Sequence, residues 1–453
     1  MATINTNGLP ANWAAMTPEQ RREYRLNLFL NPAGFEFASP AARQAYGERA
    51  RRLVDAYNVR EPDRVPAHMP LGNLPFNLAG LRMHEAMHDL EKAFLACRDF
   101  NAKYAEELET ISFPNAVPGR VLELLDYRLY ALPGHGLSVD APGYQFVEGE
   151  YMKVAEYDDF ILDPSNFWLR TYLPRVYGAF ESFRNLAPLT DMLEIPMGEL
   201  MPLALPEVQD TLQRMIDAGR EMQKRQEITA RLMEFGPALG FPSMTMQFGF
   251  APFDAVGDTL RGTRGIVTDM FRHRDKLAMA VDRMADLTID SILRSPGFPT
   301  LNTVLFPLHK GADGWMSEEQ FNTLYWPPLK RVMDALIEQG IIPVMFAEGG
   351  YNTRIETVTD FPKGSVVWWF DQTDMVKAKR VMGGRFCIQG NVPSSLICTG
   401  SPDKVTGYCR KLIEDCAPGG GYVLGAGCIP DDPKLENVRA MMAAAREYGV
   451  YRK

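Results

Sequence analysis

The chain has 453 residues, of which 46% are hydrophobic and 23% are charged, as in an ordinary globular protein. A formal net charge of −9, without a block of like charge, argues against nucleic acid or an anionic membrane as partner. No apolar run is long enough to cross a bilayer, and the first residues do not resemble a secretion signal. Six cysteines without a Cys-x-x-Cys pair are too few for a disulfide scaffold, so we expect a cytoplasmic protein.

The first 60 residues are expected to form an N-terminal helical cap. Thr17 precedes Pro18, Glu19 and Gln20, which places an N-cap residue before a proline at the first helical position. A second helix is predicted from about Pro40 to Tyr57. We expect this cap to pack against a main domain formed by residues 61–453.

The middle of the chain alternates between strand-like and helical patterns. A first strand is expected at 63–70 and further strand alternation at 143–152 and 243–250. Helices are predicted at 85–109, 164–185, 206–233 and 263–293.

The last third repeats one pattern, in which a short apolar run ends in a polar residue and a helix follows. The runs are Thr303–His309, Ile342–Glu348, Val366–Asp371, Phe386–Asn391 and Tyr422–Cys428. Such alternation indicates parallel βαβ units. We therefore predict an α/β fold, a (β/α)8 TIM barrel with an N-terminal helical extension. Candidate strands lie near 65, 145, 197, 245, 304, 344, 368, 388 and 423. Nine candidates for eight places mean that at least one is wrong, and 197 is the weakest.

Polar residues at the strand ends are the candidate site. In a closed barrel the C-terminal ends of all strands lie on one face, where active sites are built. Five residues from five strand ends should therefore surround one cavity: His309, Glu348, Asp371, Asn391 and Cys428. This convergence favours an enzyme over a binding scaffold, although it does not exclude the scaffold.

Three of these residues could hold a metal. Imidazole, carboxylate and thiolate groups bind Zn²⁺, and three protein ligands with one open position are typical of catalytic zinc. His309, Glu348 and Cys428 would supply that set. The structural alternative is a hydrogen-bonded histidine, an ion pair between Glu348 and Arg354, and a buried cysteine.

A second pattern, His84-Glu85-Ala-Met-His88, matches the His-Glu-x-x-His motif of zinc peptidases. Its third ligand would have to be an arbitrary acid such as Glu106 or Glu107. We therefore favour two surface histidines one helical turn apart, and keep a zinc peptidase as the weaker alternative.

Other residues near the strand ends have simpler roles. Asp374 is expected to cap the next helix, whereas Asp371 should face the cavity. The Asn391 amide can donate or accept a hydrogen bond toward a ligand. Trp369 could wall an aromatic pocket, although aromatic residues more often belong to the core.

Several motifs together resemble the uroporphyrinogen decarboxylase superfamily. They are Leu308–Ser317, Phe321–Leu329, Glu348–Arg354, Gly390–Pro393, Gly420–Cys428 and Glu436–Val438, with weaker likeness at Pro62–Pro66 and Val147–Met152. The resemblance covers roughly residues 60–450 and implies a (β/α)8 barrel.

The resemblance also divides the possible activities. True decarboxylases of the superfamily carry an N-terminal arginine-rich loop, which Arg60 and Arg64 do not match. Its coenzyme M methyltransferases resemble one another in a His-x-Cys pair and a distant Cys that bind zinc. Here Phe346 stands where the histidine of that pair would be, and Glu348 stands where its cysteine would be. Only Cys428, at the position of the distant cysteine, matches. The pattern is closer to the corrinoid-dependent branch that demethylates a substrate.

By resemblance, the chain is expected to be a methyltransferase that moves a methyl group from a small methyl ether, aromatic ethers included, to a corrinoid. Glu348, Cys428 and His309 would hold zinc, and Glu348, Asp371 and His309 would act in catalysis. Asn391, Arg354, Tyr151 and Trp369 would contact the substrate. The chain lacks an Asp-x-His-x-x-Gly cobalamin motif, so the corrinoid should come from a partner protein or from free cobalamin. Transfer to tetrahydrofolate and decarboxylation remain alternatives, and the oligomeric state, a homodimer included, stays open.

Overall fold

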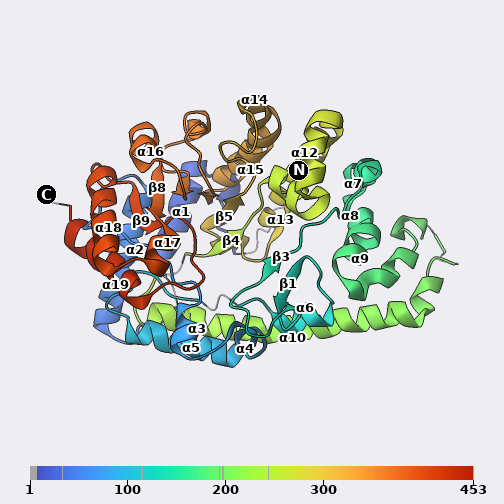
Figure 1. The fold of residues 1–453 in the computed structure, drawn as a ribbon, viewed down its shortest axis with the longest axis horizontal. Helices are drawn as coiled ribbons and strands as arrows, with labels where there is room; N and C mark the ends of the chain where they lie inside the picture. Colours follow the sequence, from blue (N-terminus) through green and yellow to red (C-terminus); the bar gives the residue numbers. More distant parts are fainter. Residues whose placement is uncertain are drawn as a thin grey trace.

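A computed structural model describes residues 8–32, 34–113, 116–192, 194–195, 198–242 and 244–451. The molecule is elongated, with a strand-containing body at one end and a helical arm at the other, joined along the 33-residue helix α10 (Pro206–Ala238) (Figure 1). No described helix is both long and apolar enough to cross a membrane.

The body is built on six parallel strands that are hydrogen-bonded in chain order: β4 (Met246–Phe248), β5 (Thr303–Leu308), β6 (Ile342–Ala347), β7 (Val367–Phe370), β8 (Cys387–Val392) and β9 (Tyr422–Ala426). Ala67 makes a parallel bridge to Leu424, which places the expected first strand beside β9. Thr110 and Ile111 line an interior cavity together with Ala67 and Met246, although residues 109–112 form no strand in the described structure. The predicted α/β barrel with an N-terminal helical region is therefore confirmed.

Two of the nine strand candidates do not belong to the barrel. The strand predicted near 145 is β3 (Gln145–Phe146), which pairs with β1 (Tyr130–Pro133) in a separate small sheet that also contains β2 (Gly136–Leu137). Alternation predicts a strand correctly, but it carries no information about the partner. Near 197 the described residues form no strand, and positions 193, 196 and 197 lie outside the described residues.

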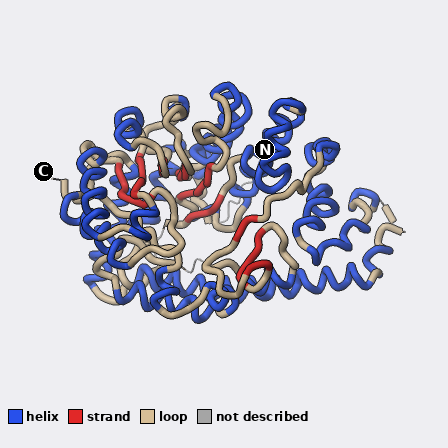
Figure 2. The backbone as a smooth tube through the Cα atoms, viewed as in Figure 1, coloured by secondary structure: helices blue, strands red, loops and turns tan. Residues whose placement is uncertain are grey.

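Helices surround the barrel strands (Figure 2). Those after the strands of the body are α11 (Pro252–Asp254), α12 (Gly262–Arg272), α13 (Arg274–Arg294), α14 (Glu318–Gln320), α15 (Trp326–Glu338), α16 (Met375–Met382), α17 (Ser394–Thr399), α18 (Pro402–Cys416) and α19 (Leu435–Tyr448). Those of the connecting segments are α3 (Leu74–Leu78), α4 (Met83–His88), α5 (Leu90–Lys103), α6 (Gly119–Leu124), α7 (Tyr157–Leu162), α8 (Pro164–Phe167) and α9 (Leu173–Val176).

The predicted helices near the N-terminus are α1 (Pro18–Leu30) and α2 (Pro40–Tyr57). Thr17 caps α1 as predicted, because its Oγ1 accepts from the Gln20 amide and the Thr17 amide donates to the Gln20 side-chain oxygen. Arg25 is 1% exposed and donates to the backbone oxygens of Phe298, Leu301 and Gln339, which precede β5 and β6. The helix α1 therefore closes the N-terminal end of the barrel. The division of the chain at residue 60 stays a prediction.

The interior of the barrel below its rim is mainly apolar, with His68 and Gln389 among its few polar side chains. Alternate strand residues form one buried cluster with α1 and α2, and this cluster includes Leu26, Phe29, Val54, Leu305, Val344, Phe346, Val367, Trp369, Cys387 and Val423. The intervening residues, such as Phe306 and Met345, join a second cluster with the surrounding helices. This two-residue period fixes which side chains can reach the mouth of the barrel.

Candidate functional site

The rim residues continue the inward-facing phase of their strands. Phe346 on β6 and Trp369 on β7 are paired in register and face the interior. Glu348 and Asp371 stand two positions further along, so the strand alternation carries both side chains over the same interior. The same phase applies to His309 after β5 and Asn391 on β8. Because the strands are parallel, these ends and Cys428 after β9 lie on one rim, as predicted.

His309 is the centre of a charged cluster. Its Nδ1 lies 2.6 Å from Asp258 Oδ2, and its Nε2 lies 3.8 Å from Glu348 Oε1. The ammonium group of Lys310 also contacts Asp258. A ring whose Nδ1–H donates to a carboxylate has a fixed orientation, and its Nε2 is directed toward a second carboxylate.

Two members of this cluster, Asp254 and Asp258, were missed by sequence analysis. Asp254 accepts from the backbone amides of His309 and Lys310 and from the Tyr325 hydroxyl, at 2.8–3.0 Å. Asp258 lies one turn later in the π-helical segment η7 (Ala255–Arg261). Neither residue ends a strand, so the rule that located the other rim residues did not include them. Their spacing of four residues just after β4 was the available signal.

The carboxylates shift the protonation of the cluster. Burial lowers the pKa of His309, but the hydrogen bond to Asp258 and the charges of Asp254, Asp258 and Glu348 raise it overall to about 9. Burial raises the pKa of Glu348, and the charge of His309 opposes that shift. Burial and the charge of Asp258 raise the pKa of Asp254 to about 6. His309 is therefore an imidazolium at neutral pH, with a proton on Nε2.

A second group lies at the ends of β7, β8 and β9. Asp371, Asn391 and Cys428 line a hollow of about 680 Å³. The Asn391 amide donates to the backbone oxygens of Asp371 and Thr373, at 2.9 and 2.8 Å, and so holds the loop after β7. A Cβ at Gly427 would lie 2.8 Å from Asp371 Oδ1, so only glycine allows this approach of the two strand ends.

Asp371 and Asp374 behave differently, as predicted. Asp371 accepts from the Gly349 amide at 3.0 Å and faces the hollow. Asp374 accepts from the amides of Val376 and Lys377 and caps α16.

The predicted zinc ligands do not form a ready three-ligand set. His309 uses Nδ1 for Asp258 and is 3.8 Å from Glu348, whereas Cys428 Sγ lies 3.1 Å from Ser394 Oγ. Over the described residues, no three ligand atoms of this rim come within 4.8 Å of one another. Burial raises the pKa of Cys428, and the nearby carboxylates oppose the thiolate that zinc requires. The donor geometry does not fit zinc without rearrangement.

The four predicted substrate contacts do not share one environment. Trp369 stacks on Phe346 with centroids 4.2 Å apart and donates to the Ala426 oxygen at 2.7 Å, so it forms the floor below the rim. Arg354 is only 3% exposed and donates to the Met316 oxygen, with its guanidinium over the Phe321 ring. This burial gives Arg354 no access to a substrate, and its structural role explains the residue.

Tyr151 belongs to the segment that crosses beside η7. Its amide donates to the Leu260 oxygen at 2.8 Å, which joins this segment to η7 two residues after Asp258. Its carbonyl accepts from Arg175 at 2.7 Å, and its hydroxyl donates to the Val147 oxygen at 2.9 Å. The backbone of Tyr151 is therefore fixed beside the helical segment that carries Asp258.

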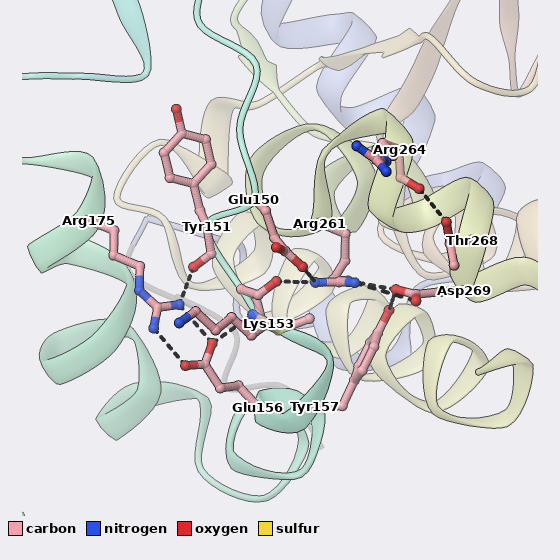
Figure 3. A network of polar contacts seen from close by, with 11 residues as sticks. Glu150, Tyr151, Lys153, Glu156, Tyr157, Arg175, Arg261, Arg264, Thr268 and Asp269 are labelled. Atoms are coloured by element: carbon pink, nitrogen blue, oxygen red, sulfur yellow. Dashed lines mark hydrogen bonds and ion pairs between the residues drawn. The ribbon is translucent and has the colours of Figure 1, made fainter. Parts of the chain in front are cut away.

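A buried arginine strengthens this attachment. In Figure 3, Arg261 of η7 binds Asp269 and Glu150 at 2.6 and 2.5 Å, while the Tyr151 ring points away from this network. The network therefore holds the segment beside η7, and substrate contact by Tyr151 stays a prediction.

The small sheet also approaches the charged cluster. Burial raises the pKa of Tyr130 on β1, and the charges of Tyr144, Asp258 and Glu348 raise it further. Tyr130 therefore lies near the rim, on β1, where the sequence predicted no strand. A tyrosine near these carboxylates is a candidate substrate contact that the strand-end rule could not find.

Comparisons with known proteins agree with this architecture. Residues 244–448 match the family model described as uroporphyrinogen decarboxylase (URO-D). The uroporphyrinogen decarboxylase of Chlorobium phaeovibrioides is 24% identical over 257 residues, which are 54% of this chain and 68% of that protein. That of Chlorobaculum parvum is 26% identical over 147 residues, 30% of this chain and 40% of that protein.

Among solved structures, a methyltransferase from Methanosarcina mazei superposes with a TM-score of 0.54 at 16% identity, covering 88% of this chain and 98% of that one. At this identity the superposition shows a shared fold. Together with the family match to the C-terminal half, it confirms the resemblance of this chain to the uroporphyrinogen decarboxylase superfamily.

Proposed function

We propose that this protein is a methyltransferase that removes a methyl group from a small methyl ether, aromatic ethers included, and transfers it to a corrinoid. The observation that carries the proposal is His309, whose pKa is raised to about 9 and whose Nε2 is directed to the rim beside Glu348. Such a group is a proton donor for a leaving oxygen.

The charge of the rim favours this reaction over decarboxylation of a polycarboxylate. Four carboxyl groups, of Asp254, Asp258, Glu348 and Asp371, accompany the cations His309 and Lys310. An anionic substrate would be repelled by such a surface, whereas a neutral ether would not. The two arginines near the first strand are engaged elsewhere, Arg60 with Asp55 and Arg64 with Glu109.

The difficult part of ether demethylation is the departure of an alkoxide or phenoxide. A Co(I) corrinoid, when bound, would supply the electron pair for the new bond to the methyl carbon. The pair of the breaking C–O bond leaves with the oxygen, which takes the proton from His309 Nε2. The substrate thus becomes an alcohol or phenol. The positive charge of the imidazolium stabilises the negative charge that develops on the leaving oxygen.

The neighbours of His309 keep the ring ready for the next turnover. Asp258 holds Nδ1–H and fixes the ring orientation, so the donated proton always leaves from Nε2. Glu348 lies 3.8 Å from Nε2, and its negative charge favours the protonated ring. Asp371 and Asn391 line the adjacent hollow. Trp369, which stacks on Phe346 and lines the cavity below the rim, is the apolar surface proposed to meet an aromatic ring.

A zinc ion on Glu348, Cys428 and His309 remains a separate proposal, and no step above passes through it. Elemental analysis of the purified protein tests it, together with Glu348→Gln and Cys428→Ser. Loss of one equivalent of zinc in both variants would support this site. Equal zinc content in both variants and the unaltered protein would rule it out.

The activity is tested by mixing the protein with chemically reduced cobalamin and a panel of methoxybenzenes, 2-methoxyphenol among them. We expect the absorbance of methylcobalamin to appear together with the demethylated phenol. Demethylation with tetrahydrofolate alone would contradict the corrinoid assignment. Release of CO₂ from a tetrapyrrole polycarboxylate, without any methyl transfer, would contradict the proposed activity altogether.

A further inference from the structure

We propose a second site, a zinc site formed by His84 and His88 on α4 and Glu123 on α6. One ligand atom from each residue lies within 4.8 Å of those of the other two, and all three side chains are partly exposed. Among the described residues this is the one group of three histidine, cysteine or acidic side chains that meets that distance. It is independent of the rim and of the proposed methyl transfer.

The two imidazoles are held in place by α4 and by close backbone contacts. They are four residues apart on one helix face, with ring centroids 4.4 Å apart. A Cβ at Gly134 would meet the His84 ring at 2.7 Å, and a Cβ at Gly119 would meet the His88 ring at 2.8 Å. The other face of α4, with Met83, is buried. These contacts limit the freedom that each ring would lose on binding a metal.

The hydrogen bonds of His88 select the nitrogen that would bind. Its Nδ1 lies 2.8 Å from the backbone oxygen of His84, so Nδ1 carries the proton. Its Nε2 lies 2.8 Å from Glu123 Oε1 and donates to this carboxylate, so zinc would take the place of the Nε2 proton. A histidine that donates one ring N–H to a carbonyl and presents the other nitrogen to a ligand is the usual arrangement at zinc sites.

The third ligand corrects the interpretation of the motif. Glu106 or Glu107 was the third ligand expected from the sequence, but Glu107 pairs with Arg439. Glu123 lies 35 residues after His88 on a different helix, so local spacing could not identify it. Zinc bonds of about 2.0–2.1 Å to nitrogen and oxygen place tetrahedral ligands about 3.3 Å apart, so a small shift of the Glu123 carboxylate would admit the ion.

The surroundings favour metal binding over peptidase chemistry. Glu85, the base of a zinc peptidase, instead accepts from the amide and guanidinium of Arg82. His84 and His88 line a surface hollow of about 510 Å³ that also includes Glu221 on α10. A zinc ion with three protein ligands and one open position toward this hollow would join α4 to α6.

The test is titration of the purified full chain with Zn²⁺ against a chromogenic chelator. We expect His88→Ala and Glu123→Gln each to weaken binding at this site by at least tenfold. His273→Ala, a histidine at the start of α13, is the matched control and should bind as the unaltered protein does. Glu348→Gln and Cys428→Ser should also keep this zinc, which separates it from any zinc at the rim.

X-ray absorption of the zinc-loaded protein gives a second readout that does not depend on activity. We expect two imidazoles in the coordination shell, and one fewer in His88→Ala. Circular dichroism of each variant checks that it is folded. The proposal is overturned if the unaltered protein takes up no zinc, or if His88→Ala and Glu123→Gln bind it as tightly as His273→Ala.

Discussion

His309 at the rim and His68 inside the barrel are two histidines of one fold with opposite surroundings. His309 has Asp254, Asp258 and Glu348 nearby, and their combined effect raises its pKa to about 9. His68 is enclosed beside Trp369, with ring centroids 5.5 Å apart, and burial lowers its pKa. The first is therefore charged at neutral pH and the second is neutral.

The difference follows from position along the barrel axis. Below the rim, strand residues and α1 fill the interior with apolar side chains, so a charge there would lose its hydration. At the rim, the strand ends and η7 supply carboxylates that can surround a cation. We therefore expect substitutions at the rim to change activity, and to change stability only through the charge of His309. Substitutions at the closed end should lower stability without changing the rate per folded molecule.

The largest expected effect is that of His309→Gln. It removes the proton donor but keeps a polar side chain, so the rate of methyl transfer should fall by about 10²–10⁴-fold. Transfer is measured by the absorbance of methylcobalamin. His273→Gln is the control and should keep the rate. If the His309→Gln protein transferred methyl groups at a rate within threefold of that of the unaltered protein, His309 would not be the acid.

At the closed end, Phe29→Ala should cost stability. Phe29 on α1 is 4% exposed and packs in the cluster that includes Phe346 and Trp369. A buried phenylalanine replaced by alanine typically lowers the free energy of unfolding by about 3–5 kcal/mol. Urea unfolding measures this, and the rate per folded molecule should stay the same. A loss of activity larger than the loss of folded protein would show that the two ends are not independent.

A smaller effect is expected from Thr17→Ala, which removes the cap of α1. The amide of Gln20 loses its partner, and such caps contribute about 1 kcal/mol. Chemical denaturation with the same rate assay gives the measurement. A change below about 0.3 kcal/mol would mean that α1 does not need its cap once packed on the barrel.

Much of the barrel was predictable from sequence because its strands carry a strong local signal. The runs ending at His309, Glu348 and Asp371 became β5, β6 and β7, and their two-residue period also fixed which end residues face the mouth. The strand predicted near 145 was real but joined the small sheet, because a strand pattern does not specify its partner.

The rest of the site depends on contacts that no local pattern encodes. Asp258 reaches His309 from a helical segment 51 residues earlier in the chain. Arg354 looked available for a substrate because it follows Glu348 by one short turn, yet its side chain folds into the core. Such outcomes depend on packing between distant elements, which sequence spacing alone does not determine.

The raised pKa of His309 also makes the stability of the fold depend on pH. Folding raises this pKa from 6.5 to about 9, so the stabilisation from the bound proton is complete below pH 6.5. It is lost as the pH rises through about 9. Urea unfolding at pH 6, 8 and 10 should show this decline, and His309→Gln should reduce it. If the free energy of unfolding declined equally with pH in both proteins, the decline would come from groups other than His309.

The most direct test of the central claim is the pH dependence of methyl transfer under substrate saturation. If imidazolium His309 is the acid, the rate should fall as the pH rises through about 9. Asp258→Asn, which removes a charge that raises this pKa, should move the fall to lower pH. A fall at the same pH in both proteins, or none up to pH 10, would contradict His309 as the proton donor.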